Sequence, residues 1–254
     1  MRALPPLVLA AALALPLSAA TRFTFECRNN ASVPYTFRGR AVVEGSSARY
    51  EVTEGGHPLF NPQMTVISKD RGAILVIVDH RQKTYFMRTT DLMSGQLSLW
   101  KGPGRTKESK HEVLVARDAD AATIAGHATT KYTLRAGYNL SMEVEGERLK
   151  GRVEAVASFW MMDGTLEAIP YGLHFAFKTG FPEIDAQVAK ALAGKGIPLR
   201  EVINVTRTIA DGPAVTESFI LEVTEVADGP AAAAAFSAPA GYVYREPSFG
   251  FQSQ

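Results

Sequence analysis

The chain has 254 residues, of which 46% are hydrophobic and 21% charged. Its 27 lysines and arginines nearly balance its 26 aspartates and glutamates, so the formal net charge is +1. This balance excludes a polybasic nucleic-acid binder and an acidic tail protein, and the apolar content excludes wholesale disorder.

The first 20 residues have the pattern of a secretory signal peptide. Arg2 supplies a positive charge, an apolar run extends from Leu4 to Leu17, and small residues occupy Ser18 to Ala20. The run is too short for a membrane span, and it ends in residues that a signal peptidase accepts. We expect residues 1–20 to be a signal peptide cleaved near Ala20, residues 21–254 to form a single β-rich domain, and the protein to be exported to the periplasm. No later stretch approaches the roughly 18 apolar residues of a membrane span, so none is expected after cleavage.

Cys27 is the single cysteine of the chain. An exported protein with one thiol has no internal disulfide, so packing must supply the stability. We expect Cys27 to lie in the core or in an edge strand.

Most of the chain after the signal alternates between apolar and polar residues, as the strands of an antiparallel sheet do when one face lies on a core. In the first half, strands are expected at Arg22–Arg28, Thr36–Glu44, Arg49–Thr53, Gln63–Lys69, Ile74–Val78 and Thr84–Arg88. In the second half they are expected around Leu140–Val144, Val153–Met161, Ile203–Ile209 and Phe219–Thr224. Between the two groups, Gly102–Lys110 is polar and contains Gly and Pro, which predicts a mobile loop.

Ala73–Val78 is apolar at every position, so both faces of this strand need a cover. An amphipathic helix that could supply it has apolar residues at steps of three and four, namely Leu166, Ile169, Leu173 and Phe177. Thr165 is placed to cap this helix, and Pro170 would kink it. A second helix is predicted between Pro182 and Gly194, with Ile184, Val188 and Leu192 on its apolar stripe.

No catalytic or metal-binding motif is present. The five histidines show neither i,i+4 nor i,i+2 spacing, and the G-x-S-x-G motif of many hydrolases is missing. Asp79 and His80 resemble an acid–base pair, but they fall in a charged hairpin turn, where such residues commonly gather. We therefore expect a protein that is not an enzyme and needs no metal or cofactor. An enzyme that uses His80 or His127 remains the third alternative.

Large apolar residues are the remaining candidates for a site. The set includes several methionines, which pack adaptably against irregular apolar ligands. Its members are Tyr85, Met87, Trp100, Leu140, Met142, Val144, Phe159 and Met161, together with Ile169, Leu173 and Phe177 of the first predicted helix. They could fill an ordinary core or line a cavity for a lipid, and their spacing does not separate these two interpretations.

Several segments resemble exported bacterial domains of unknown function that are grouped with the lipoprotein-carrier-like (LolA-like) fold. The resemblance extends over roughly residues 45–245 and concerns turns and strand starts. The segments that carry it are Ser47–Val52, Val66–Ile67, Ala73–Val78 with the turn Asp79–Lys83 and the strand Thr84–Met87, Thr123–Tyr132, Gly196–Leu199 and Phe236–Tyr242.

This resemblance implies a mainly β (α+β) fold, a curved antiparallel open half-barrel with two or three short helices against its concave face. It also implies an arginine near the cavity that tethers a lid, for which Arg49 is the nearest candidate. Our leading hypothesis is a non-catalytic cell-envelope protein that binds or carries a lipid, a lipoprotein acyl chain or another apolar ligand between sheet and helices. The alternative is an interaction module with a filled core that docks onto another envelope protein.

Overall fold

The computed structural model describes residues 20–30, 34–56, 61–89, 105–144, 146–168, 181–210 and 212–246. The first six strands of this part of the chain are β1 (Ala20–Asn29), β2 (Tyr35–Glu44), β3 (Ser47–Gly55), β4 (Met64–Lys69), β5 (Ile74–Asp79) and β6 (Thr84–Thr89). The remaining strands are β7 (Arg105–Ile124), β8 (His127–Val144), β9 (Glu147–Met162), β10 (Ile197–Ile209), β11 (Val215–Gly229) and β12 (Val243–Tyr244). One α-helix, α3 (Pro182–Leu192), and two short 3-10 turns, η1 (Asp70–Gly72) and η3 (Ala233–Phe236), complete the described elements.

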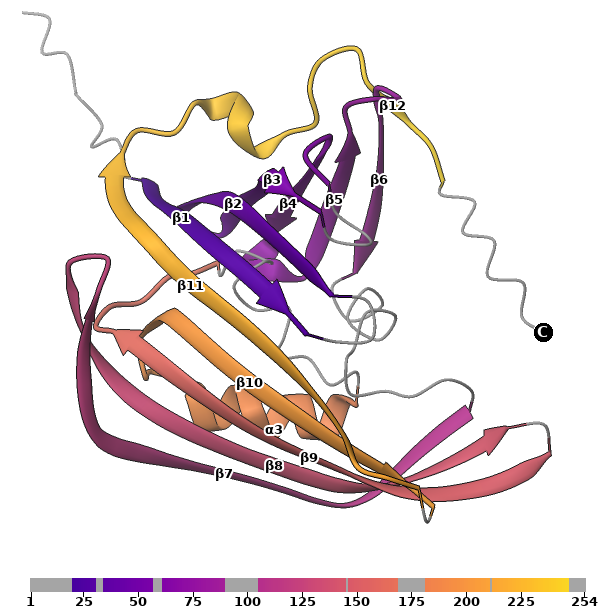
Figure 1. The fold of residues 1–254 in the computed structure, drawn as a ribbon. Helices are drawn as coiled ribbons and strands as arrows, with labels where there is room; N and C mark the ends of the chain where they lie inside the picture. Colours follow the sequence, from indigo (N-terminus) through magenta and orange to yellow (C-terminus); the bar gives the residue numbers. More distant parts are fainter. Residues whose placement is uncertain are drawn as a thin grey trace, which may run out of the picture.

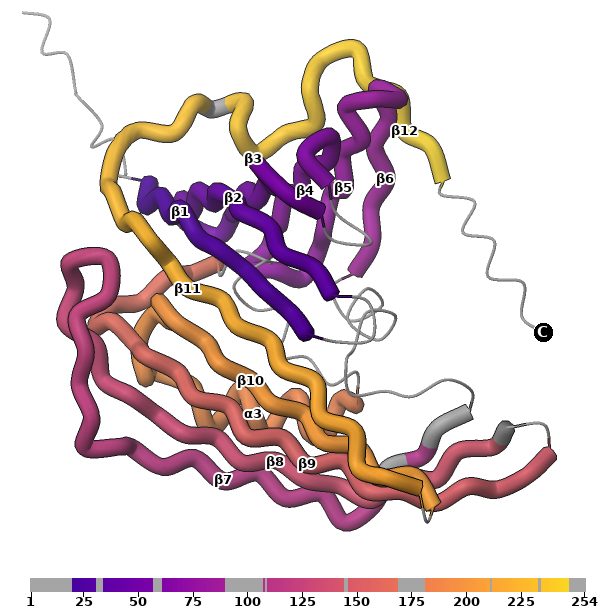
Figure 2. Tube along the Cα trace, viewed as in Figure 1, coloured from indigo at the N-terminus to yellow at the C-terminus, as the bar shows by residue number. Residues whose placement is uncertain are grey.

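All twelve described strands belong to one open, strongly curved sheet (Figure 1). Their order is β12-β6-β5-β4-β3-β2-β1-β11-β10-β9-β8-β7, so two meanders meet where β1 pairs with β11. Neighbouring strands are antiparallel, except that the short β12 lies parallel to β6. The course of the chain in Figure 2 shows the two meanders as the two sides of a trough. The predicted curved, mainly antiparallel sheet is thus confirmed.

The start of β7 corrects one sequence prediction. Residues 105–109 were expected to lie in a loop, but they pair with β8 from Glu143 to Asn139. Polar composition does not prevent this pairing, because a ladder is made by backbone groups and β8 continues far enough to supply them. Register shifts after Ser109 and Arg117 mark bulges, which bend this long edge strand.

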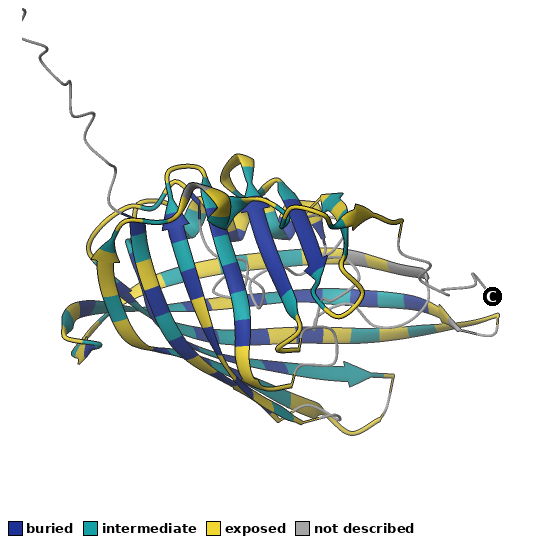
Figure 3. Cartoon of the chain, turned by 90° about the horizontal axis from the view of Figure 1, so that it is seen from above, coloured by how far each residue is buried: buried dark blue, intermediate teal, exposed yellow. Residues whose placement is uncertain are grey.

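Buried and exposed residues alternate along the strands (Figure 3), and the concave face carries the main core. Phe23, Phe25 and Cys27 supply this core from β1, and Leu134, Ala136 and Tyr138 supply it from β8. Cys27 is 1% exposed and its thiol is free, as expected of a core cysteine.

A second, smaller apolar cluster lies on the convex face of β4 and β5. It contains Ile67, Val76 and Val78, whereas Leu75 and Ile77 point into the main core. The C-terminal segment from Pro230 to Glu246 covers this cluster with Phe236, Ala238 and Tyr242 and ends beside β6. The C-terminal segment covers this outer face because the chain leaves β11 beside β1 and crosses the outside of the sheet to reach β6 (Figure 1). Most of the helix predicted over Leu166–Phe177 as a cover for β5 lies outside the described residues.

Of the two or three predicted helices, the described residues contain one α-helix. It is α3, which begins at the expected Pro182 and buries Ile184 and Val188. The other helix was predicted over Leu166–Phe177, and residues 169–180 lie outside the described residues. Thr165 and Leu166 just before them have irregular backbone, so Thr165 caps no helix there.

Candidate functional site

The concave face carries four of the predicted site residues, in two separate places along the strands. Leu140 pairs with Gly151, whereas Phe159 pairs with Tyr132, eight residues earlier on β8. Leu140 and Met142 on β8 and Phe159 and Met161 on β9 are at most 3% exposed and belong to the main core. Adjacent pairing of β8 with β9 brings the two strands' inward side chains into one layer. Val144, another of the predicted site residues, is the last residue of β8. Trp100, Ile169, Leu173 and Phe177 lie outside the described residues.

Tyr85 and Met87 lie on the opposite face of the sheet. Tyr85 packs against the convex cluster and makes an edge-to-face contact with Tyr244, the ring centroids being 5.7 Å apart. Met87 is 44% exposed. Phe86, between them, points into the main core instead. The sequence Tyr-Phe-Met is apolar throughout, so the pattern does not reveal which of its residues point inward.

An apolar cavity of about 240 Å³ lies between α3 and the ends of β9 and β10. Most of its lining is aliphatic or glycine backbone, with Thr165 and Asp185 as polar members. The lining residues are Met161, Gly164, Thr165, Leu166, Asp185, Val188, Ala189, Leu192, Ala193, Gly194, Gly196, Ile197 and Pro198. Only Met161 of the candidate residues is among them. The other lining residues were not predicted as site residues. The cavity forms where the end of a strand meets α3, and hydrophobic periodicity does not show where two elements meet.

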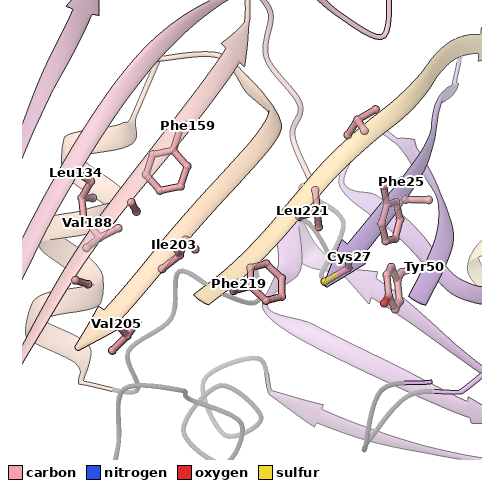
Figure 4. Close-up of a cluster of buried hydrophobic side chains, with 14 of the residues drawn as sticks. Phe25, Cys27, Tyr50, Leu134, Phe159, Val188, Ile203, Val205, Phe219 and Leu221 are labelled. Carbon is pink, nitrogen blue, oxygen red and sulfur yellow. The ribbon is translucent and has the colours of Figure 1, made fainter. Parts of the chain in front are cut away.

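α3 covers the concave side through a narrow apolar stripe. Ile184 and Val188 are buried, and Figure 4 shows Val188 beside Leu134 of β8. At the N-terminal end of the helix, Phe181 packs edge-to-face on Tyr138 with centroids 5.1 Å apart. Near the same end of the helix, the His111 ring of β7 lies 3.6 Å from the carboxylate of Glu183. Among these groups, two buried aliphatic side chains and one aromatic pair hold the helix over the cavity.

Gly196 forms one wall of the cavity and has a backbone conformation that other residues rarely adopt. Its φ is +115°, and a Cβ added there would overlap the carbonyl oxygen of Met162. Gly194, at φ +69°, has open space around it. We expect Gly196→Ala to lower the free energy of unfolding by about 3 kcal/mol or more, against about 1 kcal/mol for Gly194→Ala, which adds only backbone strain. Guanidinium unfolding of both variants measures this difference, and equal losses would contradict the predicted overlap.

Glu201 is the most unusual residue of the concave face. It lies on β10, between Phe159 of β9 and Leu221 of β11, and its side chain is fully buried. Neither carboxyl oxygen has a hydrogen-bond partner in the part of the chain that the structure describes. Burial without a partner raises the pKa of the Glu201 carboxyl well above its usual value. The signal that could have revealed it is a charged residue in phase with the inward-facing Ile203 and Val205.

The polar groups nearest along the same face also titrate outside their usual ranges. Burial, and to a smaller extent the charge of Glu201, raise the pKa of the Cys27 thiol well above its ordinary value. Burial likewise raises the pKa of Tyr35 on β2, whose hydroxyl accepts a hydrogen bond from Asn29. These groups stay uncharged at neutral pH, so the concave face carries no ionised nucleophile among them.

Arg49 lies on the convex face, away from the cavity. Its guanidinium donates to the carbonyl of Ala235 at 3.1 Å and pairs with Glu51 at 3.4 Å. It therefore holds the C-terminal segment rather than a cover of the concave face, contrary to the role that the LolA-like resemblance implied. Alternation along β3 explains this, because Tyr50 and Val52 take the inward positions.

His80 lies in the predicted turn and is hydrogen-bonded on both sides. Its ring nitrogens lie 2.8 Å from Thr65 Oγ1 and 3.0 Å from Tyr242 Oη, so it fastens the C-terminal segment to β4. Among the described residues, no cluster of three His, Cys, Asp or Glu could hold a metal ion. Within the same residues, no helix is both long and apolar enough to cross a membrane.

The sequence matches no family model and no curated protein significantly. Three solved structures resemble the fold at low identity. An uncharacterised conserved protein from Thermus thermophilus is 8% identical, with a TM-score of 0.42 over 90% of this chain and 91% of that one. A LolA superfamily protein from Nitrosomonas europaea is 9% identical, with a TM-score of 0.35 over 88% of this chain and 91% of that one. PNGF-II is 9% identical, with a TM-score of 0.36 over 91% of this chain and 31% of that one.

Proposed function

We propose that this protein binds an apolar ligand, such as a lipid acyl chain, between the concave face of the sheet and α3, without catalysing a reaction. The observation that carries the proposal is the apolar cavity of about 240 Å³ beneath the helix. The cavity is partly open to solvent, and a concave apolar pocket of this kind is where small apolar ligands bind.

The cavity is slightly smaller than the roughly 300–1,000 Å³ of typical small-molecule sites. It therefore accommodates one end of an acyl chain, and a longer ligand requires α3 to move outward. The helix is suited to such a motion, because only Ile184 and Val188 of its residues are fully buried. Each methylene that enters the site contributes about 0.8 kcal/mol, so affinity should rise with chain length until the space is filled.

Export to the cell envelope is part of the same proposal. It is supported by the apolar run and small residues of the first 20 positions. A protein that carries apolar molecules through the aqueous periplasm needs a site closed to water, which the sheet and α3 would provide. N-terminal sequencing of the protein recovered from its native host tests the predicted cleavage near Ala20.

A cavity-filling variant tests the site directly. Ala189 lines the cavity from α3, whereas Ala186, one turn earlier on the same helix, is not among the lining residues. We expect Ala189→Trp to fill the cavity and weaken the binding of diphenylhexatriene, a fluorescent hydrocarbon, at least about tenfold, because the displaced apolar contacts are worth more than about 1.4 kcal/mol. Ala186→Trp, the matched control, should leave the affinity unchanged.

Lipids that remain with the purified protein give a second measurement. Mass spectrometry of an organic extract should find acyl lipids with the unmodified protein and with Ala186→Trp, and less with Ala189→Trp. A lipid-free protein that also fails to bind diphenylhexatriene would contradict the proposal. That result would instead favour an interaction module with a filled core.

A further inference from the structure

We propose that Glu201 is the polar anchor of this site, where its protonated carboxyl donates a hydrogen bond to the carbonyl oxygen of an uncharged acyl ester. This inference rests on the proposed function and narrows the ligand class. It assigns the site an amphiphile with an ester near one end, rather than a pure hydrocarbon, a fatty acid anion or a cationic amphiphile.

The first reason is the absence of any described partner for this carboxyl. A buried polar group without a hydrogen bond is destabilising, and a leucine in the same place would carry no such cost. Both oxygens of Glu201 are buried and unpaired within the described residues, and its register neighbours are Phe159 and Leu221. A ligand that brings a hydrogen-bonding atom to this position removes the penalty only in the complex.

The second reason is the position of Glu201 relative to the cavity. Pro198 and Met161, which line the cavity, are register partners on β10 and β9. Glu201 pairs with Phe159, two residues before Met161 on the same face of β9. Two residues along a strand span about 7 Å. Glu201 does not line the cavity and its carboxyl is closed to solvent, so an ester carbonyl reaches it from the cavity when the side chains between them move apart.

The third reason concerns the charge of the partner. Burial raises the pKa of Glu201, so the carboxyl is protonated and acts as a donor. No described lysine or arginine forms an ion pair with it. The titratable or charged side chains that the elements around it place on the concave side are Cys27, Tyr35, Tyr50, Tyr132 with Lys195 beside its ring, Tyr138, the ion pair of Arg207 with Glu217, and His111 with Glu183 and Asp185 beside α3. Glu201 contributes to the raised pKa of Cys27.

Competition between two matched probes tests the anchor. Diphenylhexatriene bound to the protein is displaced either by methyl oleate, whose ester accepts but does not donate hydrogen bonds, or by 1-octadecene, which has no polar group. We expect Glu201→Leu to weaken methyl oleate about tenfold and to leave 1-octadecene unchanged. Glu201→Gln, whose amide still donates, should retain most of the affinity for methyl oleate.

The pH dependence supplies a readout that a packing role would not move. A carboxylate cannot donate a hydrogen bond, so methyl oleate should bind the wild-type protein more weakly as the pH rises towards the raised pKa of Glu201. Glu201→Gln should show no such loss. In the empty protein, the folded carboxyl holds its proton above the unfolded pKa of about 4.3, so stability should fall as the pH rises from that value to the folded pKa. Glu201→Gln should remove this fall as well.

The outcomes separate this inference from the proposed function. If diphenylhexatriene binds but Glu201→Leu leaves methyl oleate unaffected, the anchor is overturned and the apolar site stands. If oleylamine competes better than methyl oleate and gains affinity as the pH rises, the carboxylate form binds cations and the anchor is equally overturned. If diphenylhexatriene does not bind the wild-type protein, the proposed function fails, and the anchor with it.

Discussion

A chain that ends at Pro230 is expected to unfold about 10 °C below the full-length protein. Removing residues 231–254 uncovers Ile67, Val76 and Val78 on the convex face and removes the pairing of β12 with β6. Burial of each such side chain contributes about 1.5 kcal/mol or more, so the loss is roughly 4–5 kcal/mol, a large part of an ordinary domain's stability. Thermal unfolding followed by circular dichroism measures the shift.

A shorter truncation serves as the control for this prediction. Deleting residues 247–254 leaves Phe236, Tyr242 and β12 in place, so its midpoint should match that of the full chain. The uncovered cluster should also make the longer truncation prone to aggregate, because it exposes adjoining apolar side chains on β4 and β5. Equal midpoints for the two truncations would show that the C-terminal segment does not stabilise the sheet.

Phe25→Ala is expected to lower the free energy of unfolding by about 3–5 kcal/mol. The Phe25 ring is fully buried, stacks on Tyr50 at 5.5 Å and meets Phe37 edge-on at 6.4 Å. It also lies over Gly39, where an added Cβ would come within 2.5 Å of Phe25 Cζ. Urea unfolding of the variant gives the value. Arg28→Ala, on the exposed face of the same strand, should change it by less than about 0.5 kcal/mol.

The contact between Phe25 and Gly39 also predicts coupling between them. Gly39→Ala should be destabilising because its methyl group meets the ring and the carbonyl oxygen of Glu51 at 2.9 Å. In a chain that already carries Phe25→Ala, the ring is gone and Gly39→Ala should cost less. Additive losses in the double variant would contradict the packing of this ring over the glycine.

The sequence predicts the sheet better than it predicts what lies against it. Strands such as β9 and β11 alternate cleanly, and Pro182 with the stripe Ile184, Val188 and Leu192 locates α3. Alternation gives the period of a strand but not which distant segment covers it. For this reason the apolar residues of β5 were assigned a helical cover, whereas the C-terminal segment covers their outer face.

The candidate site was recovered in part for the same reason. Leu140 and Met142 could be assigned to the inner face because the polar Ser141 separates them. Phe159 and Met161 flank the apolar Trp160, but the alternation of Val153, Ala155 and Ala157 earlier in the same strand indicates their face. Tyr85 and Met87 could not, because they flank Phe86 in an apolar run. Glu201 was missed because a charged residue is ordinarily taken to point towards solvent, although it lies in phase with Ile203 and Val205 on the inward face of β10.

The pairing of β1 with β11 determines when the two meanders can join. Thr21 lies opposite Asp228, so β1 cannot pair with β11 until this late strand has been synthesised. Contacts so distant in sequence slow folding, and until they form β1 presents an unpaired edge to other chains. During that interval, newly synthesised copies in a crowded compartment could pair with one another through this edge. A chaperone that binds the unfolded chain until its last strands are made would prevent this.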